Sequence, residues 1–290
     1  MKSLFKKSLL FVLLLLLLGW FFLQPLTIYP VPQTAYFSFS TLTKAESFAP
    51  DDTTKVTCYQ PLAKTATVIN QDHLRILVWN LHKGFDQGWQ QALTRYSQDR
   101  DLLLLQEVTS EQNLPKILSD LPQQLFASPV AYKDITAGVA LLTKFVPQRY
   151  CSASVVEPWI RLPKSSISAS YALANGQSLL VISAHLINFE WIPEAYQQQL
   201  QQLIQQVKAH QGPVILAGDF NAWNAERTTL IRDMAQQLGL SEVKFTPDVR
   251  ERFNQYPLDH LFVRDMEVIE ATTEQSKASD HNPLLVELSF

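Results

Sequence analysis

Polar and ionisable side chains stand at the ends of several apolar runs in this sequence of 290 residues. In chain order they are Asn80, Glu107, His185, Asp219 with Asn221, Asp259, and Asp280 with His281. Each apolar run is typical of a buried strand. A carboxylate or an imidazole at the end of a buried strand costs free energy unless it is paired or binds a ligand. The repetition of this pattern predicts one site, assembled at the edge of a sheet core.

The carboxylates and amides of this set indicate a metal site built from hard oxygen ligands. Mg²⁺ or Mn²⁺ suits this donor set, which consists of Glu107, Asp219, Asp259 and Asp280 with Asn80 and Asn221. The sequence has no HExxH motif and its histidines lack the spacing of zinc ligands, so a zinc hydrolase is a poor fit. His185 and His281 offer acid–base groups near neutral pH. Hydrolysis of a phosphate ester requires this combination of metal, carboxylate and imidazole.

The elements that must position these residues begin near His73. We predict strands over 74–80, 102–105, 138–143, 165–173, 178–186, 213–220, 258–263 and 283–290. The dipeptide Asn175-Gly176 between two of these runs predicts a hairpin. Pro193 and an apolar stripe at helical spacing predict a helix that ends before Gly212-Pro213, and weaker patterns predict helices over 88–98, 111–121 and 224–238. These elements indicate a mixed α/β fold.

The N-terminal thirty residues predict a membrane anchor or signal segment. Lys2, Lys6 and Lys7 precede an apolar stretch from Ser8 to Leu23, and no small-x-small cleavage motif follows it. This favours a retained anchor over a cleaved signal peptide. The positive flank places the N-terminus in the cytoplasm and the rest outside, which is the periplasm in a Gram-negative cell. Residues 31–72, rich in Pro, Thr, Ser and Gln, predict a linker, which leaves 73–290 as the catalytic domain.

Charge and cysteine content limit the partners. The chain has 24 basic and 27 acidic residues, and three of the basic residues lie in the N-terminal segment. That balance is not the footprint of a strong, sequence-independent polyanion binder, although a bound metal would itself supply positive charge. Cys58 and Cys151 are compatible with one disulfide in an exported chain, or with two unrelated thiols.

Taken together, these segments resemble the endonuclease/exonuclease/phosphatase superfamily, which includes DNase I, exonuclease III-type repair enzymes, neutral sphingomyelinases and inositol-phosphate 5-phosphatases. The resemblance covers residues 73–290 and is closest to the uncharacterised bacterial members. It is carried, in order, by WN at 79–80, QE at 106–107, SAH at 183–185, GDFN at 218–221, LDH at 258–260 and SDH at 279–281. The resemblance implies a two-sheet, four-layer α/β/β/α sandwich of the DNase I-like type, with mixed, mostly antiparallel strands.

The resemblance also implies a role for each residue of the metal and water site. Glu107 would be the main metal ligand, with Asn80 beside it. Asp280 would support the metal or the neighbouring histidine. Asp219 would orient or deprotonate the attacking water, and Asn221 would hold the scissile phosphate.

Two histidines complete the catalytic set that the resemblance implies. His281 would be the second acid–base group, polarised by Asp259. His185 falls where the DNase I and sphingomyelinase branches carry a histidine, which favours those branches over an abasic-site repair enzyme. Substrate contacts are predicted for two pairs of cationic residues, each of which can instead be ordinary surface charge: Arg161 with Lys164, and Arg250 with Arg252.

We therefore predict a monomeric, metal-dependent phosphodiester hydrolase with Mg²⁺ or Mn²⁺ as cofactor and nucleic acid as the leading substrate. The alternative is a phospholipid or sugar-phosphate phosphoesterase, similar to sphingomyelinases or inositol phosphatases, which the membrane anchor and the mild acidity favour. An inactive binding module on the same fold is a third reading. The presence of every acidic and imidazole position argues against that reading.

Overall fold

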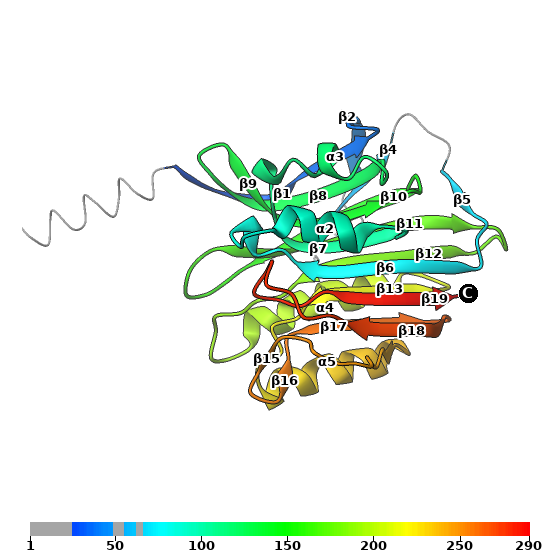
Figure 1. Cartoon of the computed structure of the whole chain (residues 1–290). Coiled ribbons are helices and arrows are strands. Elements are labelled where there is room, and N and C mark those ends of the chain that lie inside the picture. The colour runs from blue at the N-terminus through cyan, green and yellow to red at the C-terminus, as the bar shows by residue number, and fades with distance from the viewer. Residues whose placement is uncertain (1–24, 49–54, 62–65) are drawn as a thin grey trace, which may run out of the picture.

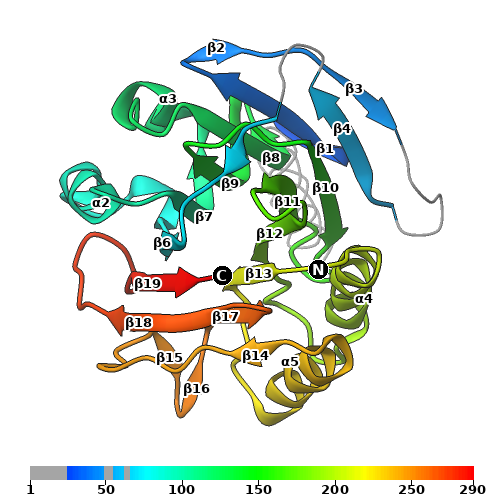
Figure 2. The ribbon, with the colours of Figure 1, turned by 90° about the vertical axis from the view of Figure 1, so that its right-hand side faces the viewer.

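The structure is a computed structural model, and it describes residues 25–48, 55–61 and 66–290. Two β-sheets face each other, and helices cover the outer face of each sheet (Figure 1). Figure 2, which looks along the strands, shows the four layers in the order helix, sheet, sheet, helix. The predicted α/β/β/α sandwich is therefore confirmed.

The first sheet has eight strands in the order β18-β19-β6-β7-β9-β8-β1-β2. Neighbouring strands are antiparallel except β6 and β7, which are parallel. The bounds are β1 Leu26–Ser38, β2 Thr41–Leu42, β6 His73–Asn80, β7 Leu102–Thr109, β8 Gln123–Tyr132, β9 Ile135–Thr143, β18 Glu267–Thr273 and β19 Leu284–Ser289.

The second sheet has nine strands, eight of them in the order β14-β17-β13-β12-β11-β10-β4-β3, while β5 pairs with the end of β11. Parallel pairing occurs between β12 and β13 and between β5 and β11. The bounds are β3 Ala45–Phe48, β4 Thr57–Pro61, β5 Val68–Ile69, β10 Arg149–Val156, β11 Pro163–Leu173, β12 Ser178–His185, β13 Val214–Asp219, β14 Ser241–Glu242 and β17 Asp259–Arg264. A separate hairpin joins β15 Arg252–Phe253 to β16 Tyr256–Pro257.

The alternating direction of side chains along the strands explains why each sheet packs against the other sheet on one face and against helices on the other. In β6, Ile76 and Val78 enter the core between the sheets, whereas Leu77 and Trp79 point to the outer helix layer. Successive side chains of a strand point to opposite faces, so a strand that is apolar on both faces needs cover on both. The outer helices provide that cover.

The helices agree with the predicted positions, apart from one. The long helices are α2 Trp89–Ser97, α4 Glu194–Lys208 and α5 Ala225–Leu238, as predicted. The prediction of a helix over 111–121 is wrong: the segment holds the 3-10 turn η2 Ser110–Gln112 and the single turn α3 Leu114–Ile117. Asn113 lies between them with a left-handed φ of 47°, which interrupts helical hydrogen bonding. A further 3-10 turn, η1, spans His82–Gly84.

The predicted linker over 31–72 is wrong for the part of that segment that the structure describes. Here β1 to β5 extend both sheets, and Tyr36 of β1 is buried with its hydroxyl donating to Gln123 at 2.5 Å. Pro32 is one of the prolines that favoured a linker, but it falls, with Pro30, where β1 shifts register between Ile28 and Gln33. Proline is tolerated at such a bulge because ladder hydrogen bonds are already interrupted there.

The predicted anchor over residues 8–23 lies outside the described residues. Within 25–48, 55–61 and 66–290, no helix is both long and apolar enough to cross a membrane. The first described strand, β1, begins at Leu26.

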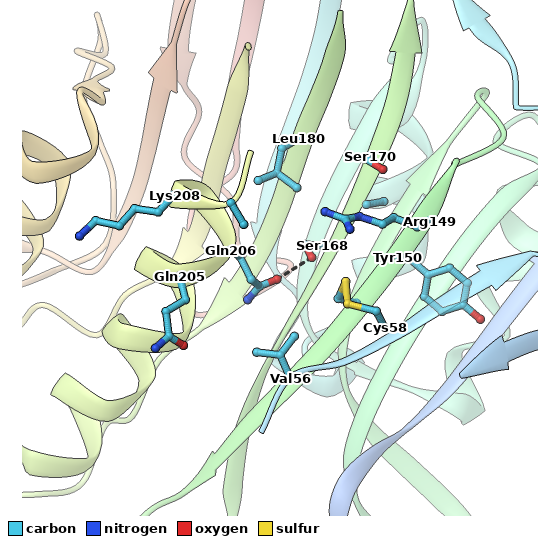
Figure 3. Close-up of a pocket in the computed structure, with 13 residues that line it drawn as sticks. Val56, Cys58, Arg149, Tyr150, Ser168, Ser170, Leu180, Gln205, Gln206 and Lys208 are labelled. Atoms are coloured by element: carbon cyan, nitrogen blue, oxygen red, sulfur yellow. Dashed lines mark hydrogen bonds between the residues drawn. A yellow bond between two sulfur atoms is a disulfide. The ribbon is translucent and has the colours of Figure 1, made fainter. Parts of the chain in front are cut away.

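The two cysteines are bridged in the structure. Cys58 of β4 and Cys151 of β10 lie opposite each other in the antiparallel pair, and a disulfide joins them. Beside the disulfide is a cleft of about 440 Å³ between α4 and strands β4, β10 and β11 (Figure 3). Across it, Ser168 donates a hydrogen bond to Gln206, and the charged groups among its described lining residues are Arg149 and Lys208. The acidic and imidazole residues singled out above lie elsewhere.

Candidate active site

The topology brings the predicted residues to one edge of the sandwich. The parallel pairs β6–β7 and β12–β13 end at this edge, so their carboxyl ends deliver Asn80, Glu107, His185 and Asp219 together. Asp259 opens the antiparallel strand β17 and lies in register with Asp219. The structure therefore brings these strand-end residues together at one edge of the sandwich, and their role as a site stays a prediction.

His281 reaches the site from the loop that precedes β19. The indole Nε1–H of Trp79 donates to the carbonyl of His281 at 2.8 Å, and the Ser279 hydroxyl donates to the carbonyl of Asn80 at 2.6 Å. These two bonds join segments 199 and 202 residues apart in the chain. They hold the SDH motif against the WN motif.

Gly218 of the GDFN motif permits the close pairing of β13 with β12. Its φ of +144° is rare for residues with a side chain, and a Cβ here would lie 1.9 Å from the carbonyl oxygen of Ala184. Glycine is thus required by both conformation and space. The approach sets His185 and Asp219 side by side.

Glu107 and Asn221 hold left-handed backbone conformations, with φ of 51° and 46°. Glu107 lies where β7 shifts register against β9, between Leu105 and Val108. Such a conformation costs a non-glycine residue about 1–3 kcal/mol and persists where the surrounding structure enforces it. Glu107 lies at a bulge and Asn221 lies just after a strand end, so neither side chain follows the alternating directions of a regular strand, and both turn toward the site.

A chain of hydrogen bonds and ion pairs links the buried groups of the site. Asp259 Oδ2 lies 2.7 Å from His281 Nδ1, and the other ring nitrogen, Nε2, is 3.8 Å from Asp219 Oδ2. Burial alone would lower the pKa of His281, but the charges of Asp259 and Asp219 outweigh it and raise that pKa to about 10. His281 is therefore a cation at neutral pH.

Asp219 is the most connected carboxylate of the site. Its Oδ2 accepts a hydrogen bond from Asn80 Nδ2 at 3.0 Å and lies 3.3 Å from His185 Nε2, while Oδ1 accepts the backbone N–H of Asn221. Burial raises the pKa of Asp219 to about 6, with the nearby charge of Asp259 adding to the rise and His281 opposing it. A carboxylate whose pKa lies this close to neutrality is suited to accept a proton.

Glu107 stands among cations. Lys83 donates to its Oε2, and its Oε1 lies 3.8 Å from Lys164 Nζ and 4.0 Å from His185 Nε2. Burial alone would raise the pKa of Glu107, but the positive potential of His185, Lys164 and Lys83 lowers it to about 2. Burial and the charge of Lys164 keep the pKa of His185 itself well below its usual value, so its ring is neutral near pH 7. Lys164 Nζ can then donate to His185 Nε2, which is 2.9 Å away.

The arrangement around Glu107 fits a divalent metal ion. Its carboxylate stays ionised, as a metal ligand must, and it already faces a positive group in the ammonium of Lys83. Mg²⁺ binds proteins through one or two carboxylates and keeps several waters, so Glu107 and the two residues that the resemblance assigns beside it, Asn80 and Asp280, carry donor groups of a suitable kind. A second group of ligand atoms, from Asp219, Asp259 and His281, lies within 4.8 Å of one another. Its histidine is protonated and bonded to Asp259, so that group better suits proton transfer than metal binding.

The remaining predicted residues differ in how close they lie to the buried cluster. The side chain of Asp280 is 55% exposed and lies 3.8 Å from His82 Nε2, at the outer rim of the site. Lys164 is part of the Glu107 cluster, and Arg161 is exposed in the loop between β10 and β11.

The predicted substrate role of the other pair is not supported by the structure. Arg250 is 8% exposed and bonds Asp248 and the carbonyl of Asp259, so its guanidinium supports the strand rather than facing the site. Arg252 pairs with the same Asp248. His260 points to the opposite face of β17, where its Nδ1 lies 2.7 Å from Glu242 Oε1.

Two residues that contact the site, Lys83 and Arg227, were not predicted from the sequence. Lys83 follows the WN motif by three positions, and that proximity was a signal for its place in the site. Arg227 of α5 is 1% exposed and donates to the carbonyls of Ile187, Asn188 and Asn221, which fixes the loop after β12 and the end of the GDFN motif. An arginine in an amphipathic helix carries no such signal.

Comparison with known proteins gives one family. The sequence model of the endonuclease/exonuclease/phosphatase family matches residues 77–281, which include every motif described above. UPF0294 proteins from Vibrio vulnificus and Vibrio cholerae are 40% and 41% identical over 237 and 236 residues, which is 80% and 79% of this chain and 82% of each relative. A UPF0294 protein of Yersinia enterocolitica is 37% identical, covering 79% of this chain and 88% of its own length.

Solved structures share the fold at low sequence identity. An endonuclease/exonuclease/phosphatase from Beutenbergia cavernae has a TM-score of 0.60 at 17% identity, over 76% of this chain and 72% of its own. The human Nocturnin catalytic domain has a TM-score of 0.59 at 18% identity, over 78% and 97% of the two chains. Danio rerio TDP2 complexed with a single-strand DNA product has a TM-score of 0.54 at 18% identity, over 76% and 100%.

Proposed function

Since this chain belongs to the endonuclease/exonuclease/phosphatase family, we propose that it is a metal-dependent phosphodiester hydrolase. One observation carries the proposal. The cationic His281 and the carboxylate of Asp219, with pKa values near 10 and 6, lie beside an ionised Glu107 in a single buried cluster. An acid, a base and a site for a cation are the three components that phosphoester hydrolysis needs.

The proton-transfer roles follow from the two pKa values. Asp219 is mostly ionised at neutral pH and accepts a proton from the attacking water, which Asn80 helps to place through their shared hydrogen bond. His281 is protonated and is the group able to donate a proton to the leaving oxygen. Asp259 orients the ring through Nδ1 and stabilises its charge, so that Nε2 points toward Asp219 and the site.

The anionic phosphate is held by the remaining polar groups. Lys164 and His185 line the site next to Glu107, and Asn221 occupies the position that family resemblance gives to phosphate binding. The side-chain amide of Asn221 is oriented by its bond to the carbonyl of Leu186 at 2.9 Å. A divalent ion held by Glu107, Asn80 and Asp280 would supply Lewis-acid stabilisation of charge on the phosphoryl oxygens.

Two substrate classes remain in the proposal. Nucleic acid is the predicted one, and TDP2, a structural neighbour, is seen with a single-strand DNA product. A phospholipid gains support from the structure, because Arg250 and Arg252 are engaged by Asp248 and because exposed aromatic side chains border the site. Membrane anchorage through residues 8–23, with the enzyme outside the cytoplasm, is part of the same proposal, and the Cys58–Cys151 bridge supports it.

A substrate panel tests the function. Full-length protein is assayed with Mg²⁺, Mn²⁺ or chelator on a generic phosphodiester, plasmid and single-stranded DNA, sphingomyelin and phosphoinositide. We expect metal-dependent hydrolysis of at least one substrate, abolished in Asp219→Asn. Metal-independent turnover, or no turnover of any phosphodiester by folded protein, contradicts the proposal. Protease accessibility in spheroplasts tests the anchorage, and protein found free in the cytoplasm contradicts that part alone.

A further inference from the structure

Exposed apolar side chains gather beside the active site. We call them the aromatic rim, and they are Trp159, Ile160, Phe189, Trp191, Ile192 and Phe253. Trp191 and Ile192 are 75% and 72% exposed, so two large apolar side chains of this loop face solvent. Trp159 and Trp191 contact each other edge to face at 5.2 Å between centroids. An exposed apolar patch of this kind beside a polar site marks an interaction surface.

The rim belongs to the same edge of the sandwich as the site. Its residues come from the β10–β11 loop, the loop after β12 and the β15–β16 hairpin, each of which adjoins a strand end that carries a site residue. A cleft of about 480 Å³ is lined by Trp159, Phe189, Trp191, Trp223 and Phe253 together with Asn221 of the site. The rim and the reaction centre are thus continuous.

The rim is held in place by buried carboxylates. Glu157, itself fully buried, accepts the backbone N–H groups of Asn188 and Phe189 at 2.5 and 3.2 Å, which joins two of the rim segments. Glu190 accepts N–H groups from Ala195 and Tyr196 at the start of α4. These bonds fix the backbone from which the apolar side chains project, so the fold itself holds those side chains at the surface.

The described chain also begins at this edge. Leu26 of β1 pairs with Tyr132 at the β8–β9 turn, and β9 starts there and pairs with the end of β7 just after Glu107. In Figure 1, β1 starts on the same side as the β15–β16 hairpin, opposite the C-terminus. The sequence that precedes Leu26 contains the apolar stretch from Ser8 to Leu23. A membrane segment there would tether this edge, and not the opposite one, next to the bilayer.

We propose that the active-site edge docks on a lipid bilayer, with the aromatic rim inserted at the membrane interface and the site facing lipid headgroups. Tryptophan, phenylalanine and isoleucine favour the boundary between headgroups and acyl chains, where an apolar face lies roughly 5–10 Å deep. Nucleic acid is a weaker fit, because it needs a track of free cations. Among the described residues of the rim segments the cations are Arg161 and Arg252, and the second is paired with Asp248.

A fluorophore at the rim tests the docking without requiring turnover. Full-length Ile192→Cys carries the only free thiol, because the natural cysteines are bridged, and it is labelled and reconstituted into phosphatidylethanolamine–phosphatidylglycerol vesicles. The apolar N-terminal stretch can itself hold the chain on vesicles, so the label reports which edge faces lipid. Ile269→Cys, on β18 near the opposite edge, is the matched control and is 54% exposed in the native protein.

We expect the label at position 192 to be quenched by nitroxide-bearing lipid and shielded from iodide, and the label at 269 to behave in the opposite way. Replacing Trp159 and Trp191 with serine should weaken the lipid contact by about 10- to 100-fold, since each buried large apolar side chain contributes of order tenfold. Equal iodide access at both positions overturns the proposal. Shielding by a single-stranded oligonucleotide in detergent, without shielding by lipid, also overturns it and assigns the rim to nucleic acid. Neither result depends on the proposed hydrolase activity.

Discussion

Replacing Asp259 with asparagine should move the basic limb of the pH–activity profile toward neutrality. Activity of the native protein is expected to rise with pH as Asp219 ionises near 6, and to fall as His281 loses its proton near 10. Asp259 is the nearest source of the potential that keeps His281 charged, at 2.7 Å. The amide keeps the shape of the side chain and removes that charge.

The size of the shift follows from this distance. Coulomb's law at 2.7 Å with an effective dielectric of about 20 gives about 6 kcal/mol for the full charge pair. The change in pKa is smaller, because Asp219 still lies 3.8 Å from the ring. An opposite charge at close range shifts a pKa by about 1–3 units, so we expect the basic limb to fall by about 2–3 units and activity at pH 9 to drop about 10- to 100-fold relative to the native enzyme.

The assay is the pH dependence of kcat/KM on a soluble phosphodiester at saturating metal, with folding checked by circular dichroism. Glu242→Gln is the matched control, because it breaks another carboxylate–imidazole pair of 2.7 Å, with His260, on the far side of the same sheet. The control should leave both limbs in place. A basic limb that stays near pH 10 in Asp259→Asn would refute the assignment of His281 as the acid.

Protein stability gives a second readout of the same pair. The pKa of His281 is raised by folding, so its contribution to the free energy of unfolding is complete below about pH 6.5 and disappears as pH rises toward 10. The slope of stability against pH across this range should be shallower in Asp259→Asn. His281→Ala should remove most activity, and combining it with Asp259→Asn should add little further loss, because one residue acts through the other. Fully additive losses would reject the pairing.

Other substitutions test the rest of the site. Glu107→Gln should keep the fold and lose at least about 100-fold in activity at limiting Mg²⁺, because the charge that holds the ion is gone. An Mg²⁺ dependence of activity equal to that of the native protein would contradict the role of Glu107 as a metal ligand. Lys164→Met should raise the pKa of His185 in an NMR titration, since Lys164 contributes to holding that pKa low. An unchanged His185 titration would remove Lys164 from the cluster. Arg227→Ala should lower the free energy of unfolding by about 3 kcal/mol in urea denaturation, because buried carbonyls lose their donors. A loss below 1 kcal/mol would show that water replaces the guanidinium.

Much of the site could be predicted from the sequence because its residues stand at strand ends. The runs around Asn80, Glu107 and Asp219 are apolar enough to be buried, and a polar residue at such a position has few explanations other than a site. The hairpin at Asn175-Gly176 and the helix after Pro193 followed from local backbone preferences. These signals are local, and they survive in any tertiary context.

The misjudged segments depended on contacts between distant parts of the chain. Residues 31–72 resemble a linker in composition, yet β1 and β4, which overlap this range, gain strand structure by pairing with β8 and β10, about 90 residues later. Pairing partners of this kind leave no trace in the local pattern. Arg250 differs, because its partners are near in sequence: Asp248 is two residues away and the carbonyl of Asp259 nine residues away, and both engage the guanidinium that was expected to bind phosphate.

The sequence by itself determined the types of reactive groups and the strands that carry them, because strand periodicity and the cost of burying charge act within a few residues. Only the tertiary structure decided the distances between those groups. The pKa shifts of His281, Asp219 and Glu107 arise from burial and from charged neighbours on other strands and loops, and the aromatic rim becomes a surface only when three separate segments meet beside the site. Electrostatic coupling and surface continuity depend on separation in space, which the order of residues along the chain does not specify.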